Sequence, residues 1–433
     1  MAKFDPIAYI NEPRWQKVSL GLERTRLLLE KLGRPQDALR FVHVAGTNGK
    51  GSTCAYIERI LREAGYRTGL FTSPFIHCFE ERIRVCGRNI SVEALGAVTL
   101  AVRDAACEVE AQLGEHPTEF ELMCATALCH FAQERCDIVV LEVGLGGRLD
   151  STNVIERPEL CVVTPIALDH TAILGETIPE VAAEKAGILK SGAPVLSWPQ
   201  KPEAMAVIEA RAAELGCPVT VADFGKLEAG PLRLGEGQRP FRTFTYEGEA
   251  YRTGLLGSYQ PANAVMALEA VRLLRQRGWR IPEDAERRGV ERAQWPGRFE
   301  VVATGPLTIV DGGHNPQGAQ ALAESLTEVL QATGQKKAAL AMGVLADKDV
   351  RAMVRAVAPR AAGFVLYAPE NPRALAAEQL AQVIAEEAPG VPVALAPDAA
   401  AALRQARAQA GPEGVAVAFG TLYAIADLMK ALD

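Results

Sequence analysis

A lysine and two hydroxyl-bearing residues follow a glycine-rich turn, and this combination predicts a phosphate site. The apolar run that begins at Phe41 leads into Gly46, Thr47, Asn48, Gly49, Lys50, Gly51 and Ser52. A helix is expected there, from about 52 to 64. Glycines let backbone N–H groups approach phosphate oxygens, the helix N-terminus carries a partial positive charge, and Lys50 adds a full one. The alternative is an ordinary glycine-rich turn, because Val44 and Gly51 depart from the common phosphate-loop pattern.

A second candidate site follows the apolar run that ends at Glu142. An acidic residue at the end of a strand can hold magnesium directly or through water. The glycines that follow let a loop pass close to a ligand, and Arg148 and Asp150 give that loop charge. The alternative is a solvated loop with a surface glutamate, but a carboxylate that ends such an apolar strand favours function.

His170 and Lys185 form a third group with less decisive chemistry. His170 could ligate a divalent metal, and an imidazole suits manganese better than magnesium. It is equally well read as a structural histidine. Lys185 lies in a partly apolar helix, where the alternative is a lysine that extends its ammonium group to the surface.

The segment from Asp311 to Asn315 is the candidate site of the second half of the chain. Asp311 ends an apolar run, and His314 stands near an expected helix start, so the pair can bind a ribose, an ammonium group or a phosphate. Asn315 is also a plausible N-cap, with Pro316 at the first helical position. His43, by contrast, lies inside the expected strand and is interpreted as a core residue.

Composition restricts the class of protein. The chain has 433 residues with a net charge of −7, which argues against general nucleic-acid binding. No apolar run approaches the length of a membrane span, and the N-terminal residues lack a signal-peptide pattern, so a cytoplasmic protein is expected. Nine cysteines without paired spacing are interpreted mostly as small buried apolar residues.

Short β-branched runs alternate with helical patterns, which predicts an α/β fold of two domains. The first should be a P-loop-type, mostly parallel sheet with helices on both faces, over residues 1–296. Residues 218–256 are rich in Gly and Arg and predict hairpins at a sheet edge. The expected strands are 40–45, 67–71, 137–142, 160–164 and 194–197, and the expected helices include 92–113, 120–133, 178–189 and 260–276.

A second alternation predicts a smaller Rossmann-like α/β domain over residues 299–433, after a junction near Trp295. Because ligands of open α/β sheets bind beyond the carboxyl ends of the strands, the polar clusters described above should line a cleft. The expected strands are 307–310, 338–342, 363–367, 391–395 and 414–419. The expected helices are 316–333, 349–357, 374–387, 398–410 and 421–432.

Taken together, the polar segments resemble the folylpolyglutamate synthase/dihydrofolate synthase family of the Mur ligase superfamily. The matches run in the family's order over most of the chain. Two departures are Phe75, where the family commonly has His, and Gly313, where it commonly has Ala. The matching segments are 43–52, 72–74, 81–83, 118–121, 142–150, 168–170, 184–187, 296–298, 311–316 and 419–423.

The resemblance implies ATP-dependent amide ligation: a folate carboxylate attacks the γ-phosphate of ATP, and the amine of glutamate then displaces phosphate from the acyl phosphate. It also implies roles for single residues. Lys50, Lys185 and His314 are the expected catalytic residues, with His314 near the glutamate site and Lys185 as a carbamylated lysine. The expected ATP contacts are Gly46, Thr47, Asn48, Gly49, Lys50, Gly51, Ser52, Asn263, Arg298 and Asp311. The expected metal ligands are Ser73, Glu142, His170 and Lys185. The expected folate contacts are Arg82, Thr118, Phe120, Glu121, Leu149, Asp150 and Ser151.

The expected cofactors are ATP and Mg²⁺, with Mn²⁺ as a substitute and K⁺ as an additional candidate. The expected partners are small molecules, namely a folate or dihydropteroate, L-glutamate and ATP, with no nucleic acid and no membrane, and the chain is expected to be a monomer. Two alternatives stay open. One is another Mur-type amino-acid ligase, and the other is a nucleotide-dependent switch that hydrolyses ATP slowly and independently of any amino acid.

Overall fold

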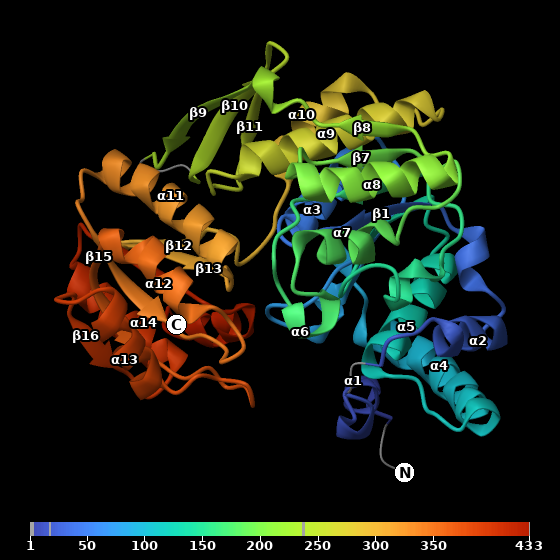
Figure 1. The fold of residues 1–433 in the computed structure, drawn as a ribbon, viewed down its shortest axis with the longest axis horizontal. Helices are drawn as coiled ribbons and strands as arrows, with labels where there is room; N and C mark the ends of the chain where they lie inside the picture. The colour runs from blue at the N-terminus through green and yellow to red at the C-terminus, as the bar shows by residue number, and fades with distance from the viewer. Residues whose placement is uncertain (1–3, 17–18, 236–238, 433) are drawn as a thin grey trace. The chain divides into compact units, whose positions relative to one another are not determined.

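The computed structural model describes residues 4–16, 19–235 and 239–432, which form two compact units (Figure 1). The N-terminal unit comprises Met1–Gly225 and Asn263–Val290, and the C-terminal unit comprises Lys226–Ala262 and Glu291–Asp433. The N-terminal unit therefore differs from the expected domain 1–296. Residues 226–262 pack with the C-terminal unit, where Arg242 pairs with Glu328 and the Ser258 amide donates to Ser325 Oγ.

The N-terminal unit is built on an eight-stranded sheet of order β4-β3-β2-β5-β1-β6-β7-β8. The six strands from β2 to β8 in this order are parallel, while β3 and β4 add an antiparallel edge that the sequence patterns did not predict. The strands are β1 (Phe41–Ala45), β2 (Thr68–Phe71), β3 (Ile83–Val85), β4 (Arg88–Asn89), β5 (Ile138–Glu142), β6 (Leu160–Val163), β7 (Val195–Ser197) and β8 (Val219–Val221).

Both faces of this sheet are buried, as the apolar runs predict. Side chains alternate between faces along a strand, and every residue of β1 is buried. Phe41 packs in one apolar cluster with α4 and α5, Ala45 packs in another with α7 and α8, and Val42 and Val44 point to the opposite face. The helices before β12 are α1 (Pro6–Ile10), α2 (Glu23–Lys31), α3 (Lys50–Glu63), α4 (Val92–Leu113), α5 (Glu119–Gln133), α6 (Thr171–Leu174), α7 (Ile178–Ala186), α8 (Pro202–Leu215), α9 (Gln260–Gln276) and α10 (Glu283–Arg292).

Residues 218–256 do not form hairpins at the edge of the main sheet, and that expectation was wrong. Of the described residues in this segment, only those of β8 join the main sheet. The rest forms a separate antiparallel sheet of order β11-β10-β9, made of β9 (Leu227–Arg233), β10 (Phe241–Tyr246) and β11 (Glu249–Thr253). Arg242 on β10 is buried and donates to Leu256 O, so this sheet has a polar anchor of its own.

The C-terminal unit also contains a six-stranded sheet of order β12-β13-β17-β14-β15-β16, parallel except for β12. Its strands are β12 (Glu300–Thr304), β13 (Leu307–Asp311), β14 (Ala338–Met342), β15 (Ala361–Leu366), β16 (Val393–Leu395) and β17 (Val415–Phe419). Its helices are α11 (Pro316–Thr333), α12 (Val350–Val357), α13 (Ala377–Glu387), α14 (Ala399–Ala410) and α15 (Ile425–Met429).

Local signals explain several helix boundaries. Asn315 caps α11 by accepting from the Gly318 amide, with Pro316 at the first position, as predicted. Thr118 and Glu121 form a reciprocal capping box at the start of α5. Three expected helices are clearly shorter than predicted: α7 ends at Ala186, α13 begins at Ala377, and the last helix is broken into a 3₁₀ turn (Leu422–Ala424) and α15.

Candidate active site

The phosphate turn joins β1 to α3 in the predicted order. Gly49 is the N-cap of α3 and has φ +82°, a conformation that favours glycine. A Cβ on Gly49 would lie only 2.8 Å from Asn263 Oδ1, so the expected ATP contact on α9 lies against this turn. Thr47 attaches the turn to the segment that follows β6. Its amide donates to Pro165 O, and its hydroxyl donates to Ala167 O at 2.9 Å.

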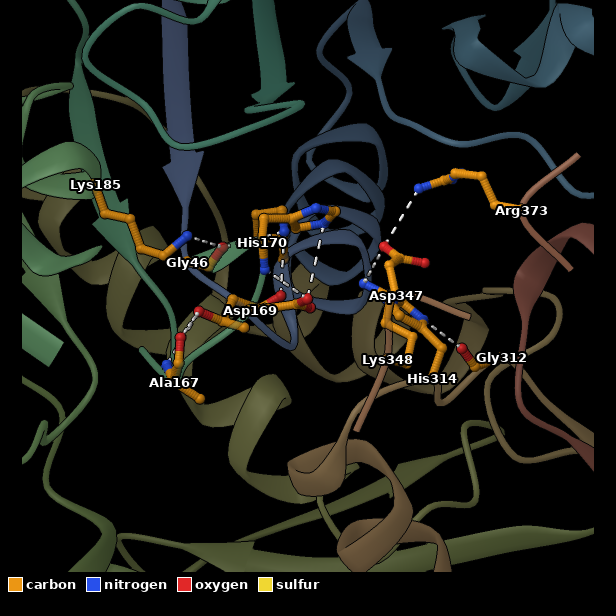
Figure 2. A network of polar contacts seen from close by, with 12 residues as sticks. Gly46, Ala167, Asp169, His170, Lys185, Gly312, His314, Asp347, Lys348 and Arg373 are labelled. Atoms are coloured by element: carbon orange, nitrogen blue, oxygen red, sulfur yellow. Dashed lines mark hydrogen bonds and ion pairs between the residues drawn. The ribbon is translucent and has the colours of Figure 1, made fainter. Parts of the chain in front are cut away.

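Two lysines converge on one carbonyl of this turn. Lys50 Nζ donates to Gly46 O at 3.1 Å and to Thr47 O at 3.2 Å. Lys185 Nζ, from α7, donates to the same Gly46 O at 2.9 Å (Figure 2). Lys50 places positive charge where the helix N-terminus already favours an anion.

Lys185 is not a surface lysine, because only 3% of it is exposed. Burial away from water, and next the nearby Lys50 charge, lower the pKa of Lys185 to about 7 from 10.5, although Asp169, Asp150 and Glu184 act in the opposite direction. A large part of the Lys185 population is therefore a neutral amine at neutral pH.

Ser73 and Glu142 meet at the carboxyl ends of β2 and β5. Glu142 is buried, and the Ser73 amide donates to its Oε2 at 3.3 Å. A hydroxyl and a carboxylate oxygen are donors that suit Mg²⁺. Among the described residues, no three His, Cys, Asp or Glu side chains converge as a metal site. The residues therefore fit a magnesium ion that also takes oxygens from water and phosphate.

His170 is the expected metal ligand on the loop between β6 and α6. It is exposed, precedes α6 with φ +51°, and its Nε2 lies 3.9 Å from Asp169 Oδ1. The metal role of His170 stays a prediction.

The loop after Glu142 is tied down by Asp150. Asp150 is buried and accepts from the Leu145 amide at 2.8 Å, from the Thr152 amide at 3.0 Å and from the Thr152 hydroxyl. Burial raises the pKa of the Asp150 carboxyl, and these hydrogen bonds oppose that rise. Its neighbour Ser151 is also buried, whereas Leu149 lines a pocket of about 460 Å³ with residues of α2 and α4.

Several expected folate contacts near α5 already interact with other residues of the protein. Glu121 accepts from Thr118 N at 2.7 Å and forms an ion pair with Arg24 at 3.1 Å. The Arg82 guanidinium lies 5.0 Å from the centre of the Phe75 ring, so the departure at Phe75 provides a cation–π partner. The Phe120 ring packs on Phe71 with 6.0 Å between centres.

In the C-terminal unit, Asp311 organises the loop that carries His314. The Asp311 carboxylate accepts from the amides of Phe299 and Gly313, both at 2.7 Å, and from the Tyr259 hydroxyl at 3.3 Å. Burial raises the pKa of Asp311, while the Arg298 charge lowers it, so Arg298 lies close to Asp311. His314 Nδ1 contacts Gly312 O at 2.9 Å (Figure 2).

A charged group follows β14 that the sequence motifs did not predict. Lys348 has only 7% of its side chain exposed, and its Nζ lies 3.8 Å from Asp347 Oδ2, which also pairs with Arg373 at 3.4 Å (Figure 2). Two cations thus share one carboxylate at the carboxyl end of a parallel strand. The signal available in the sequence was the run Asp347-Lys348-Asp349 shortly after an apolar strand.

Comparisons with known proteins agree with this geometry. Residues 44–271 match the model of the Mur ligase middle domain, and residues 297–422 match that of the Mur ligase glutamate ligase domain. The chain is 37% identical to the dihydrofolate synthase/folylpolyglutamate synthase of Bacillus subtilis, over 96% of this chain and 95% of that protein. The chain belongs to the folylpolyglutamate synthase/dihydrofolate synthase family. Members of this family are ATP-dependent amide-forming ligases, and this chain is one of them.

Solved structures of this family share the whole fold. The Mycobacterium tuberculosis folylpolyglutamate synthase complexed with ADP and AMPPCP superposes with a TM-score of 0.87 at 30% identity, with 98% of each chain covered. Escherichia coli FolC in complex with DHPP and ADP superposes with a TM-score of 0.84 at 30% identity, with 99% of this chain and 98% of that chain covered. The expected two-domain α/β fold is confirmed. In the described part of the chain, no helix is long and apolar enough to cross a membrane.

Proposed function

We propose that this ligase uses Mg-ATP to add L-glutamate to folates, acting both on tetrahydrofolate and on dihydropteroate. The observation that supports this most is the position of Lys50, whose ammonium group contacts Gly46 O and Thr47 O at the start of α3. Attack of a carboxylate on a phosphate brings two anions together, and fixed positive charge at that point lowers its cost.

The ATP phosphates bind the turn from Gly46 to Ser52, and Asn263 contacts the nucleotide from α9. Lys50 exchanges its two carbonyl contacts for phosphate oxygens when the nucleotide binds. Arg298 and Asp311 are further proposed nucleotide contacts. The substrate carboxylate then attacks the γ-phosphorus, ADP leaves, and an acyl phosphate results. The glutamate amine displaces phosphate from it, so one amide bond forms for each ATP consumed.

Ser73 and Glu142 would hold a magnesium ion, with His170 as a further ligand. A bound ion would supply positive charge next to the phosphate oxygens. Ser73 and Glu142 supply oxygen donors, and the Ser73 amide fixes the carboxylate that would bind the ion. Mn²⁺ is the substitute that His170 would tolerate best.

Lys185 carries a carbamate in the active enzyme. A neutral amine adds CO₂ to give a carbamate and releases one proton, and burial of Lys185 favours the neutral form. The reaction converts a buried neutral group into an anion beside Lys50. Intact mass measured with and without bicarbonate tests this, and an active enzyme that keeps an unmodified Lys185 would exclude it.

The two substrates bind in different units. The folate side uses Arg82, Thr118, Phe120, Glu121 and the segment from Leu149 to Ser151. The glutamate side uses His314, and Lys348 supplies the positive charge that an amino-acid carboxylate needs.

We also propose a cytoplasmic monomer with K⁺ as an additional cation. Light scattering at working concentration tests the monomer, and turnover compared in KCl and in the chloride of a bulky organic cation tests K⁺.

The function is tested by phosphate release from Mg-ATP with glutamate and one pterin at a time. Glutamate-dependent release with dihydropteroate and with tetrahydrofolate supports both activities, while release with tetrahydrofolate alone would restrict the enzyme to chain extension. No dependence on either pterin would favour another Mur-type ligase. Release that is independent of glutamate would favour a nucleotide-dependent switch.

A further inference from the structure

His43 is a fully buried polar residue in the middle of the main sheet. It lies on β1 between Leu141 of β5 and Cys161 of β6, and none of its surface is exposed. Every other residue of this strand is apolar. Burying an imidazole is unfavourable unless its nitrogens are hydrogen-bonded, so an apolar residue would serve the core better. The polar side chain needs another reason.

A hydrogen-bond chain leads from His43 to the loop after Glu142. His43 Nε2 lies 2.9 Å from Thr152 Oγ1, and Thr152 Oγ1 donates to Asp150 Oδ1. Because the single hydroxyl hydrogen is used by Asp150, the hydroxyl accepts from His43, and His43 carries its proton on Nε2. Nδ1 of His43 has no partner, which is consistent with an unprotonated nitrogen there. Burial lowers the pKa of His43 to about 3, so this ring stays neutral.

Asp150 is the end of that chain and the centre of the loop. Its oxygens accept from the amides of Leu145 and Thr152 as well as from the Thr152 hydroxyl. The carboxylate therefore sets the path of residues 145–152, which include the proposed folate contacts Leu149 and Ser151. Asp150 itself is buried and committed to these donors.

The same loop is attached to α7 by other contacts. Asn153 Nδ2 donates to Arg148 O and to Gly187 O, both at 3.0 Å, and the Arg148 amide donates to Glu184 O at 2.8 Å. The hydrogen bond between His43 and Thr152 links this loop to β1, the strand that leads into the phosphate turn.

We propose that His43 is a positioning residue for the folate substrate, because it holds Thr152 and Asp150, and through them the segment from Leu149 to Ser151, in register with the phosphate turn. The inference rests on the proposed folate role of that segment. Asp150 then acts through the loop rather than by touching the substrate.

Replacement of the Thr152 hydroxyl tests the chain at its central link. Thr152→Val keeps the shape of the side chain and removes the two hydrogen bonds of the hydroxyl, to His43 and to Asp150. Thr152→Ser keeps the hydroxyl. Thr99→Val is the matched control, because Thr99 is equally buried in α4 of the same unit and its hydroxyl has no hydrogen-bond partner. For each variant, kcat, the KM values of the pterin, glutamate and ATP, and thermal unfolding are measured.

We expect Thr152→Val to raise the pterin KM at least about tenfold, because it loses the hydrogen bond to His43 and the one to the Asp150 carboxylate. The ATP KM and kcat should stay within about twofold of wild type, and Thr152→Ser should restore the pterin KM. His43→Leu loses only the bond to Thr152 and should raise the pterin KM by a smaller factor, and the double variant should give no more than Thr152→Val alone.

The inference is overturned if folded Thr152→Val keeps the wild-type pterin KM, if Thr99→Val shares its increase, or if the ATP KM rises equally. Additive effects of His43→Leu and Thr152→Val would also overturn it. A wild-type chain without glutamate-dependent turnover on any pterin would instead refute the proposed function, before any variant is compared.

Discussion

We expect the buried amine of Lys185 to lower the stability of the protein although the amine is needed for turnover. The variant Lys185→Met separates the effect on stability from the effect on turnover. The side chain is 3% exposed and donates one hydrogen bond, to Gly46 O. Methionine has a similar length and no charge, so it removes the buried amine and keeps the packing. We therefore expect a more stable and inactive protein.

The magnitude follows from the pKa. A shift of the Lys185 pKa from 10.5 to about 7 corresponds to about 5 kcal/mol against the protonated form, at about 1.4 kcal/mol per pH unit. Loss of the hydrogen bond to Gly46 costs about 1 kcal/mol. At pH 7 the variant should be more stable by about 3–4 kcal/mol, or about 6–16 °C in the unfolding transition of the N-terminal unit.

The assay is differential scanning calorimetry in degassed, bicarbonate-free buffer, where the amine is unmodified, together with phosphate release in Mg-ATP. Turnover should fall by at least about 100-fold, the upper range for groups that support a metal. Lys201→Met is the matched control, since Lys201 is exposed at the start of α8 and should change neither quantity.

A lower unfolding temperature for Lys185→Met would refute the argument, because it would mean that the buried amine stabilises the native state. Turnover within about tenfold of wild type would refute the proposed role of Lys185 as a metal-supporting carbamate, since such groups are worth about 10–100-fold.

Three further predictions follow from the same site. Glu142→Gln should keep the fold and lose at least about 100-fold in turnover, because the amide cannot replace the carboxylate near Ser73 as a metal ligand, and an active, folded variant would exclude that metal role. Gly49→Ala should raise the ATP KM at least about tenfold, because its Cβ would press on Asn263 Oδ1. Gly33→Ala is the matched control, because Gly33 also has a positive φ (+78°) but nothing lies near its Cβ, so this variant should change stability alone. Equal ATP KM values for Gly49→Ala and Gly33→Ala would contradict the clash with Asn263. Between pH 7 and pH 10 the unfolded chain binds more protons at Lys185 than the native chain does. Wild-type stability should therefore rise with pH relative to that of Lys185→Met. Urea-denaturation midpoints that change with pH in the same way for both proteins would disprove the lowered pKa of Lys185.

The local sequence pattern was sufficient to predict many of the helices and strands and the order of the motifs. The alternation of β-branched runs with helical periods predicted β14, α4 and α11 with the bounds observed. β14 is a short run that is buried throughout, and the two helices each begin at a clear capping residue, Ser91 or Asn315. The glycine, lysine and hydroxyl residues from Gly46 to Ser52 are contiguous, so their chemistry could be read without knowing what packs around them.

Long-range packing was needed wherever a role depends on a partner distant in the sequence. The separate sheet of β9–β11 belongs with the C-terminal unit because Arg242 reaches Glu328, 86 residues later. His43 looked like an ordinary core residue, and its contact with Thr152 lies 109 residues away. Lys185 looked like a candidate surface lysine, since nothing in its own helix indicates that it reaches Gly46, 139 residues before it. Burial and hydrogen bonding across the sheet set the charge and the partner of each of these groups, and neither quantity is encoded within a short window of sequence.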